Sequence, residues 1–333
     1  EAIERLAEVA ARHGRVSILA HVDGLPVGGT APRYPIHALA FGSEVATDPA
    51  FLVIAGVHGL ERVGTAVAIA YLHTLLAQLA WDATLHDALA HSRIVVVPLV
   101  NPTGMATRRR ATARGVDLMR NAPVHPDTAA MPLVGGQRLS ARLPWFMGAE
   151  GTLEPEARAL IELVEATTIG SRLAIAVDLH SGFGLVDRVW FPYARTRTPA
   201  PHLAELLALR RLLDHTLPNH VYRIEPTAQA YTIAGDLWDH LYDRAVDRGD
   251  TLLPLTLEMG SWSWVRKNPA QALTRLGRFN PTKPHRLRRT LRRHLPLLEL
   301  LHRAARSADA WAILDPPTRA ALEQAAFQEW YAI

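Results

Sequence analysis

Two histidines and two carboxylates stand where strands of this chain are expected to end. His58 and Glu61 are three positions apart, whereas His180 and Glu258 each follow an apolar run that reads as a buried strand. Two histidines and one carboxylate are a recurrent set for catalytic zinc, because three protein ligands leave a fourth position open for water. We therefore take His58, Glu61 and His180 as candidate ligands of one divalent ion. A buried Glu258 would be costly unless it is paired or functional.

The elements that must position these side chains are predicted from apolar periodicity. Strands are predicted at residues 16–22, 34–41, 51–57, 94–100, 173–179, 189–193 and 251–257. Helices are predicted at residues 1–13, 65–80, 154–168, 202–217, 270–305 and 319–331. Alternation of strands and helices from 34 to 260 predicts an α/β fold, with a mixed, mainly parallel twisted sheet and helices on both faces. The carboxyl ends of such strands converge on one crevice, which would bring the four side chains together.

The regions between and after these elements have their own character. Residues 101–104 have a turn composition, and residues 122–153 are rich in Pro and Gly with little periodicity, which predicts a long functional loop. We expect a catalytic domain at residues 1–268 and a helical C-terminal extension packed on it at 269–333. The extension has a basic face, which is more typical of a solvated helix face than of a binding patch. Its members are Arg286, Arg288, Arg289, Arg292 and Arg293.

Composition limits the class of protein. The 333 residues are 49% hydrophobic and 20% charged, with a net charge of +4, which describes a globular chain. No apolar run approaches the roughly 20 residues that span a bilayer. Neither a nucleic-acid module nor a signal peptide is visible, so no membrane or nucleic-acid partner is expected and a cytoplasmic location is favoured. The chain begins at Glu1, however, and a leader could have been trimmed.

The chain has no cysteine. A disulfide framework and a thiolate metal site are therefore both excluded for these 333 residues. Any metal must be held by histidine, carboxylate or carbonyl oxygen.

At these residues the chain resembles the zinc carboxypeptidase family (the M14-like metallopeptidases, with their succinylglutamate desuccinylase/aspartoacylase relatives), and an uncharacterised bacterial branch within it. His58-Gly-Leu-Glu61 matches the first zinc motif, His180 in Asp-Leu-His-Ser-Gly matches the third ligand, and Glu258 matches the general base. The resemblance covers about residues 34–265, with the motifs in family order. It implies a carboxypeptidase-like fold and one Zn²⁺ per chain.

Two further motifs carry the resemblance. Residues 116–121 resemble the family's Asp-x-Asn-Arg-Asn segment, in which the Asp supports the first zinc histidine and the Asn-Arg pair grips the terminal carboxylate of the substrate. Residues 231–242 follow the family's Tyr-x₃-Gly-x₃-Asp pattern, in which Tyr231 closes over substrate. Met119 departs from the family because asparagine is usual there. Trp238 stands where side-chain preference is often set, and its bulky apolar ring argues against a basic terminal residue.

The resemblance implies a role for each remaining candidate. Arg110 would stabilise the developing oxyanion, with Arg109 as the alternative since the adjacent arginines leave the register open. Asp117 would orient His58, and Asp178 would act likewise nearby. The candidate substrate contacts are Arg120, Asn121, Arg109, Ser181 and Trp238, together with Tyr231.

Taken together, these residues predict a zinc-dependent hydrolase that cleaves an amide bond, most simply a metallocarboxypeptidase that releases a C-terminal residue from a peptide. One alternative is an N-acyl amino acid amidohydrolase of the desuccinylase/aspartoacylase type. Another is a non-catalytic metal-binding or basic-surface interaction protein, against which the retention of Glu258 beside three ligands argues. The expected partner is a peptide or an acyl-amino acid. The sequence does not specify an oligomeric state.

Overall fold

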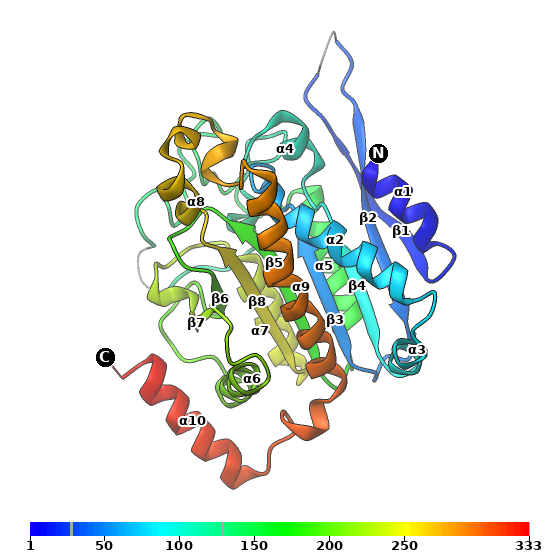
Figure 1. The fold of residues 1–333 in the computed structure, drawn as a ribbon. Helices are drawn as coiled ribbons and strands as arrows, with labels where there is room; N and C mark the ends of the chain where they lie inside the picture. Colours follow the sequence, from blue (N-terminus) through cyan, green and yellow to red (C-terminus); the bar gives the residue numbers. More distant parts are fainter. Residues whose placement is uncertain (27–28, 128–129, 333) are drawn as a thin grey trace.

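The apolar runs form one eight-stranded sheet in the computed structural model, which describes residues 1–26, 29–127 and 130–332 (Figure 1). The order across the sheet is β1-β2-β4-β3-β5-β8-β6-β7. The bounds of the strands are β1 Arg15–Asp23, β2 Arg33–Gly42, β3 Ala50–Ala55, β4 Arg93–Val97, β5 Ala174–Ser181, β6 Arg188–Phe191, β7 Arg223–Pro226 and β8 Leu252–Met259.

The centre of the sheet is parallel. β3 pairs in parallel with β4 and β5, and β5 pairs in parallel with β8. β1 and β2 form an antiparallel edge, β6 runs antiparallel to β8, and β7 runs parallel to β6. Every residue of β3 and β5 is buried, as continuous apolar runs predict for strands covered on both faces. The predicted mixed, mainly parallel sheet is confirmed.

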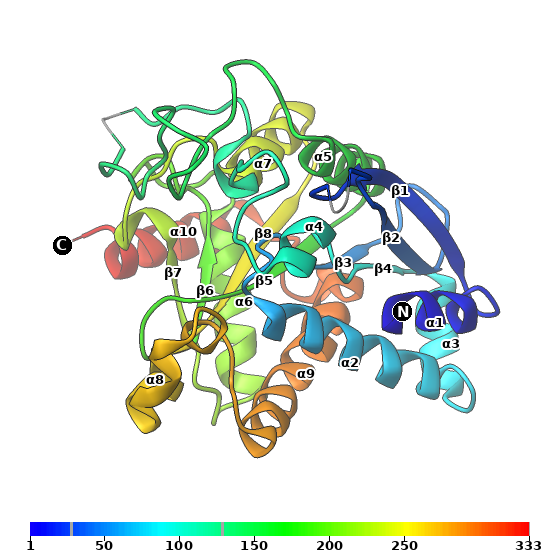
Figure 2. The ribbon, with the colours of Figure 1, turned by 90° about the horizontal axis from the view of Figure 1, so that it is seen from above.

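Helices cover both faces of the sheet (Figure 2). α5 and α7 share a hydrophobic core with one face, whereas α1, α2, α6, α9 and α10 share a core with the other. The bounds of the helices are α1 Ala2–Ala10, α2 Arg62–Gln78, α3 Ala83–Ala90, α4 Pro102–Thr107, α5 Pro155–Thr168, α6 Leu203–Thr216, α7 Leu237–Arg248, α8 Trp262–Lys267, α9 Pro284–Arg306 and α10 Pro316–Trp330.

The structure departs from the predicted elements in several places. The predicted turn after β4 is the start of α4, because Asn101 accepts a hydrogen bond from Gly104 N and Pro102 occupies the first helical turn. The helices α3, α7 and α8 and the strand β7 were not predicted. The helix predicted over 270–305 is wrong at its start, where the short 3₁₀ turns η3 (Pro269–Leu273) and η4 (Leu276–Arg278) precede α9.

The C-terminal segment takes part in the main core. Leu297, Leu298 and Leu301 of α9 are buried in the cluster that includes β3, β5 and α2. In α10, Trp330 is buried, and its ring centroid lies 4.7 Å from that of Phe191 in β6. The domain boundary after residue 268 stays a prediction.

In the described parts of the chain, no single helix is long and apolar enough to cross a membrane. α2 and α3 meet that length and composition only as a pair, and their axes are bent by 106° relative to each other.

Candidate active site

The turn between β3 and α2 presents the first two candidate ligands. β3 ends at Ala55, and Gly56 follows with φ +68°, a conformation that favours glycine. A Cβ at Gly59 would lie 1.9 Å from the carbonyl carbon of Gly104, so only glycine lets this turn pack on α4. His58 and Glu61 therefore project from a tightly held turn at the carboxyl edge of the sheet, and α2 begins immediately afterwards.

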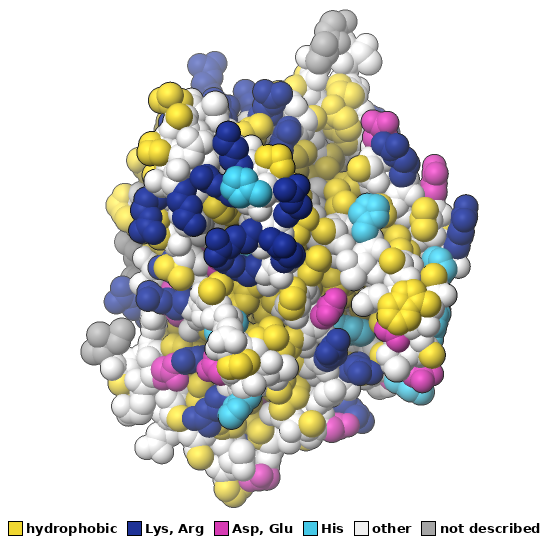
Figure 3. Space-filling view, in the orientation of Figure 1, with side chains coloured by type: hydrophobic (Ala, Val, Ile, Leu, Met, Phe, Trp, Pro, Cys, Tyr) yellow, Lys and Arg dark blue, Asp and Glu magenta, His cyan; other side chains and the backbone are white. Residues whose placement is uncertain are grey.

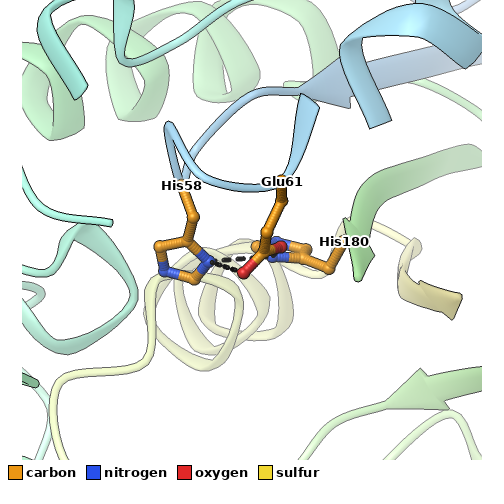
Figure 4. A group of neighbouring side chains, drawn as sticks. All are labelled: His58, Glu61 and His180. Carbon is orange, nitrogen blue, oxygen red and sulfur yellow. Dashed lines mark hydrogen bonds and ion pairs between the residues drawn. The ribbon is translucent and has the colours of Figure 1, made fainter. Parts of the chain in front are cut away.

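The three candidate ligands meet at one point (Figure 4). One ligand atom from each of His58, Glu61 and His180 lies within 4.8 Å of the others, and all three residues are buried. The two Nδ1 atoms are 3.2 Å apart, His58 Nδ1 is 3.0 Å from Glu61 Oε1, and His180 Nδ1 is 3.1 Å from Glu61 Oε2. Two imidazole nitrogens and a carboxylate that converge from different strands are a donor set that suits a divalent zinc ion.

A carboxylate lies behind each imidazole. His58 Nε2 lies 2.9 Å from Asp117 Oδ1, and His180 Nε2 lies 2.8 Å from Asp178 Oδ2. Trp238 Nε1 donates to the same Asp178 oxygen at 2.9 Å. Each far nitrogen therefore lies beside a carboxylate, and the two Nδ1 atoms face the shared point. The predicted placement of Asp117 and Asp178 beside the ligand histidines is what the structure shows.

Charge pairing dominates this cluster. Burial raises the pKa of Asp117, but Arg110 and His58 hold it well below its usual range. Burial also raises the pKa of Glu61, and the two histidines outweigh that effect and lower it. Burial lowers the pKa of His180, yet Asp178 and Glu61 raise it well above its ordinary value. Both carboxylates are thus kept ionised, as metal ligation and its support require.

Glu258 lies at the end of β8, paired in register with His180 on β5. Its Oε1 accepts a hydrogen bond of 2.9 Å from Phe183 N. Burial, followed by the charge of Glu61, raises the pKa of Glu258 to about 8. A carboxyl with a pKa near neutrality can both accept and return a proton.

The cluster opens into a cavity of about 1020 Å³. The cavity is lined by the three ligands, by Glu258, and by most of the other predicted residues, namely Arg109, Arg110, Arg120, Ser181, Tyr231 and Trp238. Arg120 and Trp238 are buried at 3% exposure, which places them deep in the cavity, whereas Arg109 is exposed. Tyr231 packs against Phe183 and Trp190, and burial raises its pKa.

The arginines differ in what they bind. Arg110 donates from Nε to Asp117 Oδ2 at 2.8 Å and from Nη1 to Glu61 Oε1 at 3.1 Å. Arg120 donates to the carbonyl oxygens of Val134 and Met119. Arg110 thus braces a ligand and the carboxylate behind His58.

Two predicted substrate contacts have other partners. Asn121 does not line the cavity: its amide donates to the carbonyls of Met147 and Thr152 and accepts from Glu154 N, so it braces the long loop 122–153. Ser181 N donates to Glu61 Oε2 at 2.9 Å, and its hydroxyl donates to the carbonyl of Phe279 at 2.8 Å. The substrate roles of both residues stay predictions.

Sequence reasoning missed several residues of this cavity. Asp236 and Asp239 are buried in its wall; Asp239 accepts hydrogen bonds from Ala194 N and Arg195 N, and Asp236 caps α7. Burial raises the pKa of Asp236 to about 6. Asp239 belongs to the Tyr-x₃-Gly-x₃-Asp pattern, so its signal was present. Arg275, Arg278 and Phe279 also line the cavity, and they come from the segment predicted as a helical C-terminal extension packed on the catalytic domain.

Comparison with known proteins gives the same family as the motifs. The chain is 26% identical over 173 residues to carboxypeptidase D of Anas platyrhynchos, a match that covers 50% of this chain and only 11% of that protein. Its fold resembles that of thrombin-activatable fibrinolysis inhibitor (TM-score 0.61, 18% identity, 87% of this chain and 72% of that one). It also resembles a metallo-carboxypeptidase from Pseudomonas aeruginosa, solved with (2-guanidinoethylmercapto)succinic acid (TM-score 0.53, 17% identity, 91% and 68%). The family model described as zinc carboxypeptidase matches residues 9–270, and the chain belongs to this family.

Proposed function

We propose that this protein is a zinc-dependent metallocarboxypeptidase that hydrolyses the amide bond preceding the C-terminal residue of a peptide. The observation that carries the proposal is the convergence of His58, Glu61 and His180 beside a fourth side chain, the carboxyl of Glu258, in a cavity large enough for a peptide end. Family membership supports the same chemistry. When bound, zinc supplies a water of lowered pKa and polarises the scissile carbonyl.

The residues of the chain divide the remaining work. Glu258 accepts the proton of the attacking water and returns it to the departing amine, from its position at the end of β8 opposite the ligand His180. Asp117 and Asp178 hold the two imidazoles in the orientation that ligation needs. Arg110 places a guanidinium at the cluster, where it can offset negative charge that develops on the carbonyl oxygen.

The deep part of the cavity would hold the C-terminal residue. Arg120 brings a buried positive charge there, and a guanidinium can bind a carboxylate through two hydrogen bonds. Met119 contributes no polar group at the position where the family usually has asparagine. Trp238 and Ile233 present apolar surface to the terminal side chain. The two residues favour an apolar rather than a basic terminal residue.

Replacement of the proposed base tests the mechanism. Glu258→Gln keeps the shape of the side chain but cannot take a proton, so the variant should retain stoichiometric zinc by metal analysis and lose at least about 10³-fold in kcat. Glu162→Gln, an exposed change on α5, is the matched control and should leave both quantities unchanged. Unchanged turnover in Glu258→Gln would remove Glu258 as the base.

The substrate class needs a separate assay. Peptides with a free C-terminus, the same peptides amidated at the C-terminus, and N-acyl amino acids should be compared with the zinc-loaded protein. A carboxypeptidase hydrolyses only the first set with appreciable kcat/KM. Preference for N-acyl amino acids would replace the peptidase with the amidohydrolase alternative.

A further inference from the structure

A long stretch of the chain after β8 carries positive charge and no negative charge. Residues 260–298 contain ten Lys and Arg residues and neither Asp nor Glu. This stretch comprises α8, the turns η3 and η4, and the first half of α9. Figure 3 shows Lys and Arg side chains gathered on one face of the molecule, over α8 and the start of α9. We call this stretch the basic segment.

Most charges of the basic segment have no carboxylate partner. Within the described part of the chain, Arg293 alone among its ten cations has a carboxylate within 4.0 Å, that of Asp187. Eight of the ten are exposed: Arg266, Lys267, Arg275, Arg278, Lys283, Arg288, Arg289 and Arg292. Like charges held close together without counter-charges repel one another, so the folded chain accepts an electrostatic cost on this face that an anionic partner would relieve.

The basic segment reaches the mouth of the active-site cavity. Arg275 and Arg278 line the cavity beside Phe279, whose carbonyl accepts the hydrogen bond from Ser181 next to the ligand His180. Arg109 and Arg142 also line the cavity and come from two other loops. All four arginines are exposed, and in the described residues none has a carboxylate within 4.0 Å. We call Arg109, Arg142, Arg275 and Arg278 the rim arginines.

The deeper cavity differs from the mouth because it carries charged groups of both signs. Asp236, Asp239 and Glu258 lie buried in its wall together with Arg120, whereas the mouth has the exposed rim arginines. When the terminal carboxylate of a peptide reaches the buried Arg120, the rest of the bound peptide must run out through the mouth, past the rim arginines. Residues on the amino-terminal side of the scissile bond therefore meet the positive charge of the rim arginines.

We propose that the rim arginines and the adjoining basic segment bind acidic residues of a polypeptide substrate, on the amino-terminal side of the bond that is cut. The inference rests on the proposed carboxypeptidase function and specifies its substrate class. A flexible chain can enter the cavity and lie along the basic segment at the same time. A bilayer or a nucleic-acid duplex could cover only the outer face, so the continuity of rim and cavity favours the peptide.

Kinetics with matched peptides tests the proposal. Three peptides share their last two residues and carry three Glu, three Gln or three Lys residues immediately before them. At low salt the Glu peptide should have a kcat/KM about tenfold above that of the Gln peptide, mainly through a lower KM. Each exposed ion pair contributes little by itself, so a difference of this size needs several pairs together. The advantage should disappear near 1 M NaCl, where the Debye length is about 3 Å. Equal kcat/KM for the Glu and Gln peptides at low salt would overturn the inference and leave the carboxypeptidase function standing.

Charge reversal identifies the residues responsible. In Arg275→Glu/Arg278→Glu the ratio of kcat/KM for the Glu and Lys peptides should fall by at least about tenfold. The matched control is Arg12→Glu/Arg211→Glu, which changes two exposed arginines that do not line the cavity and makes the same change in net charge. The control should keep the ratio of the parent protein. Equal falls in the two variants would show that overall charge, and not the rim, sets the preference.

Direct binding separates this inference from the proposed function. The Glu peptide, labelled for fluorescence anisotropy, should bind Glu258→Gln at least about tenfold more tightly than the Gln peptide, whether or not any peptide is hydrolysed. If the zinc-loaded parent protein hydrolyses no peptide but this difference in binding is found, the carboxypeptidase function fails and the acidic-peptide surface remains. Vesicles containing phosphatidylserine and a single-stranded oligonucleotide are the competitors. Equal binding of the two peptides, or stronger binding of either competitor, would overturn the peptide assignment.

Discussion

Each ligand imidazole has a carboxylate beside its far nitrogen, and Asp117 is the carboxylate with more partners. It lies 2.9 Å from His58 Nε2, and it accepts hydrogen bonds from Arg110 Nε and from Met119 N. In Asp117→Asn one carboxylate oxygen becomes an amide nitrogen, which cannot accept a hydrogen bond. Either His58 or Arg110 therefore loses its acceptor. We expect zinc affinity to fall by about 10–100-fold, measured by competition with a chromophoric chelator. Asp247→Asn, an exposed change on α7, should not alter it.

A second prediction concerns a carboxyl far from the metal cluster. Burial raises the pKa of Glu156, in the first turn of α5, from 4.5 to about 7. Below pH 4.5 the carboxyl is protonated in both the folded and the unfolded chain, so its ionisation does not affect the free energy of unfolding. Between pH 4.5 and 7 the unfolded chain loses this proton while the folded chain keeps it, so the free energy of unfolding falls as pH rises. The loss is complete above pH 7 and is on the order of 3 kcal/mol.

Glu156→Gln should therefore flatten the pH dependence. Urea unfolding at pH 5 and at pH 8 should show a smaller loss of stability in this variant than in the parent protein, and a higher stability at pH 8. Glu162→Gln lies on the exposed side of the same helix and should follow the parent profile. A Glu156→Gln protein less stable than its parent at pH 8 would contradict the buried, proton-binding carboxyl.

The grouping of the ligand residues could be read from the sequence, whereas their supporting contacts could not. His58, Glu61 and His180 stand at strand ends that a parallel sheet brings to one edge, so their meeting follows from topology. The partners of Asn121 lie 26 to 33 positions further along the chain. A loop without periodicity gives no means to predict such contacts. Asn121 was expected to contact substrate because residues 116–121 resemble a segment of the family.

At the scale of elements, Asn280 joins the C-terminal segment to the ligand turn. Its Oδ1 accepts from Val63 N at 2.9 Å, and its Nδ2 donates to Leu60 O at 2.7 Å and to Leu276 O at 2.8 Å. Leu60 and Val63 flank the ligand Glu61. A distant side chain thus satisfies a backbone N–H at the start of α2, where helix geometry leaves donors without partners.

Asn280→Ala should loosen the ligand turn. The loss of a bond to a buried backbone group costs about 1–3 kcal/mol, so Tm should fall by several degrees, and zinc should dissociate faster into excess chelator. Asn268→Ala is the control, since no hydrogen bond of its side chain is found in the described structure. A fall in Tm with an unchanged rate of zinc loss would restrict Asn280 to a role in stability alone.

Strong periodicity explains which elements could be predicted. The buried strands β3, β5 and β8 and the helices α2, α5 and α6 were found because each has a sustained apolar pattern. β7 has four residues and α3 has eight, which are too short for periodicity to distinguish them from loops. Over 270–283 the apolar spacing suggested a helix, but Pro281 and Pro284 prevent α9 from extending back through this region.

At the scale of the whole molecule, the C-terminal segment contributes both to the core and to the cavity. α9 covers the face of the sheet shared with α2, and the residues before it supply Arg275, Arg278 and Phe279 to the cavity wall. Leu297, Leu298 and Leu301 share one core with β3 and β5, and a domain boundary after residue 268 stays a prediction.

Truncation tests whether residues 1–268 can fold alone. Removal of residues 269–333 strips several buried leucines from the sheet. Each buried leucine contributes about 2 kcal/mol, so the loss is comparable with the roughly 5–15 kcal/mol that stabilises a typical protein. We expect an insoluble chain or one without a cooperative thermal transition. Removal of residues 307–333 alone keeps α9 and the cavity wall, and this shorter truncation should remain folded with a lower Tm, because α10 packs at the side of the sheet on α6 and β6. A cooperative transition and zinc binding in the 1–268 fragment would instead establish residue 268 as a domain boundary. They would also show that the core folds without α9.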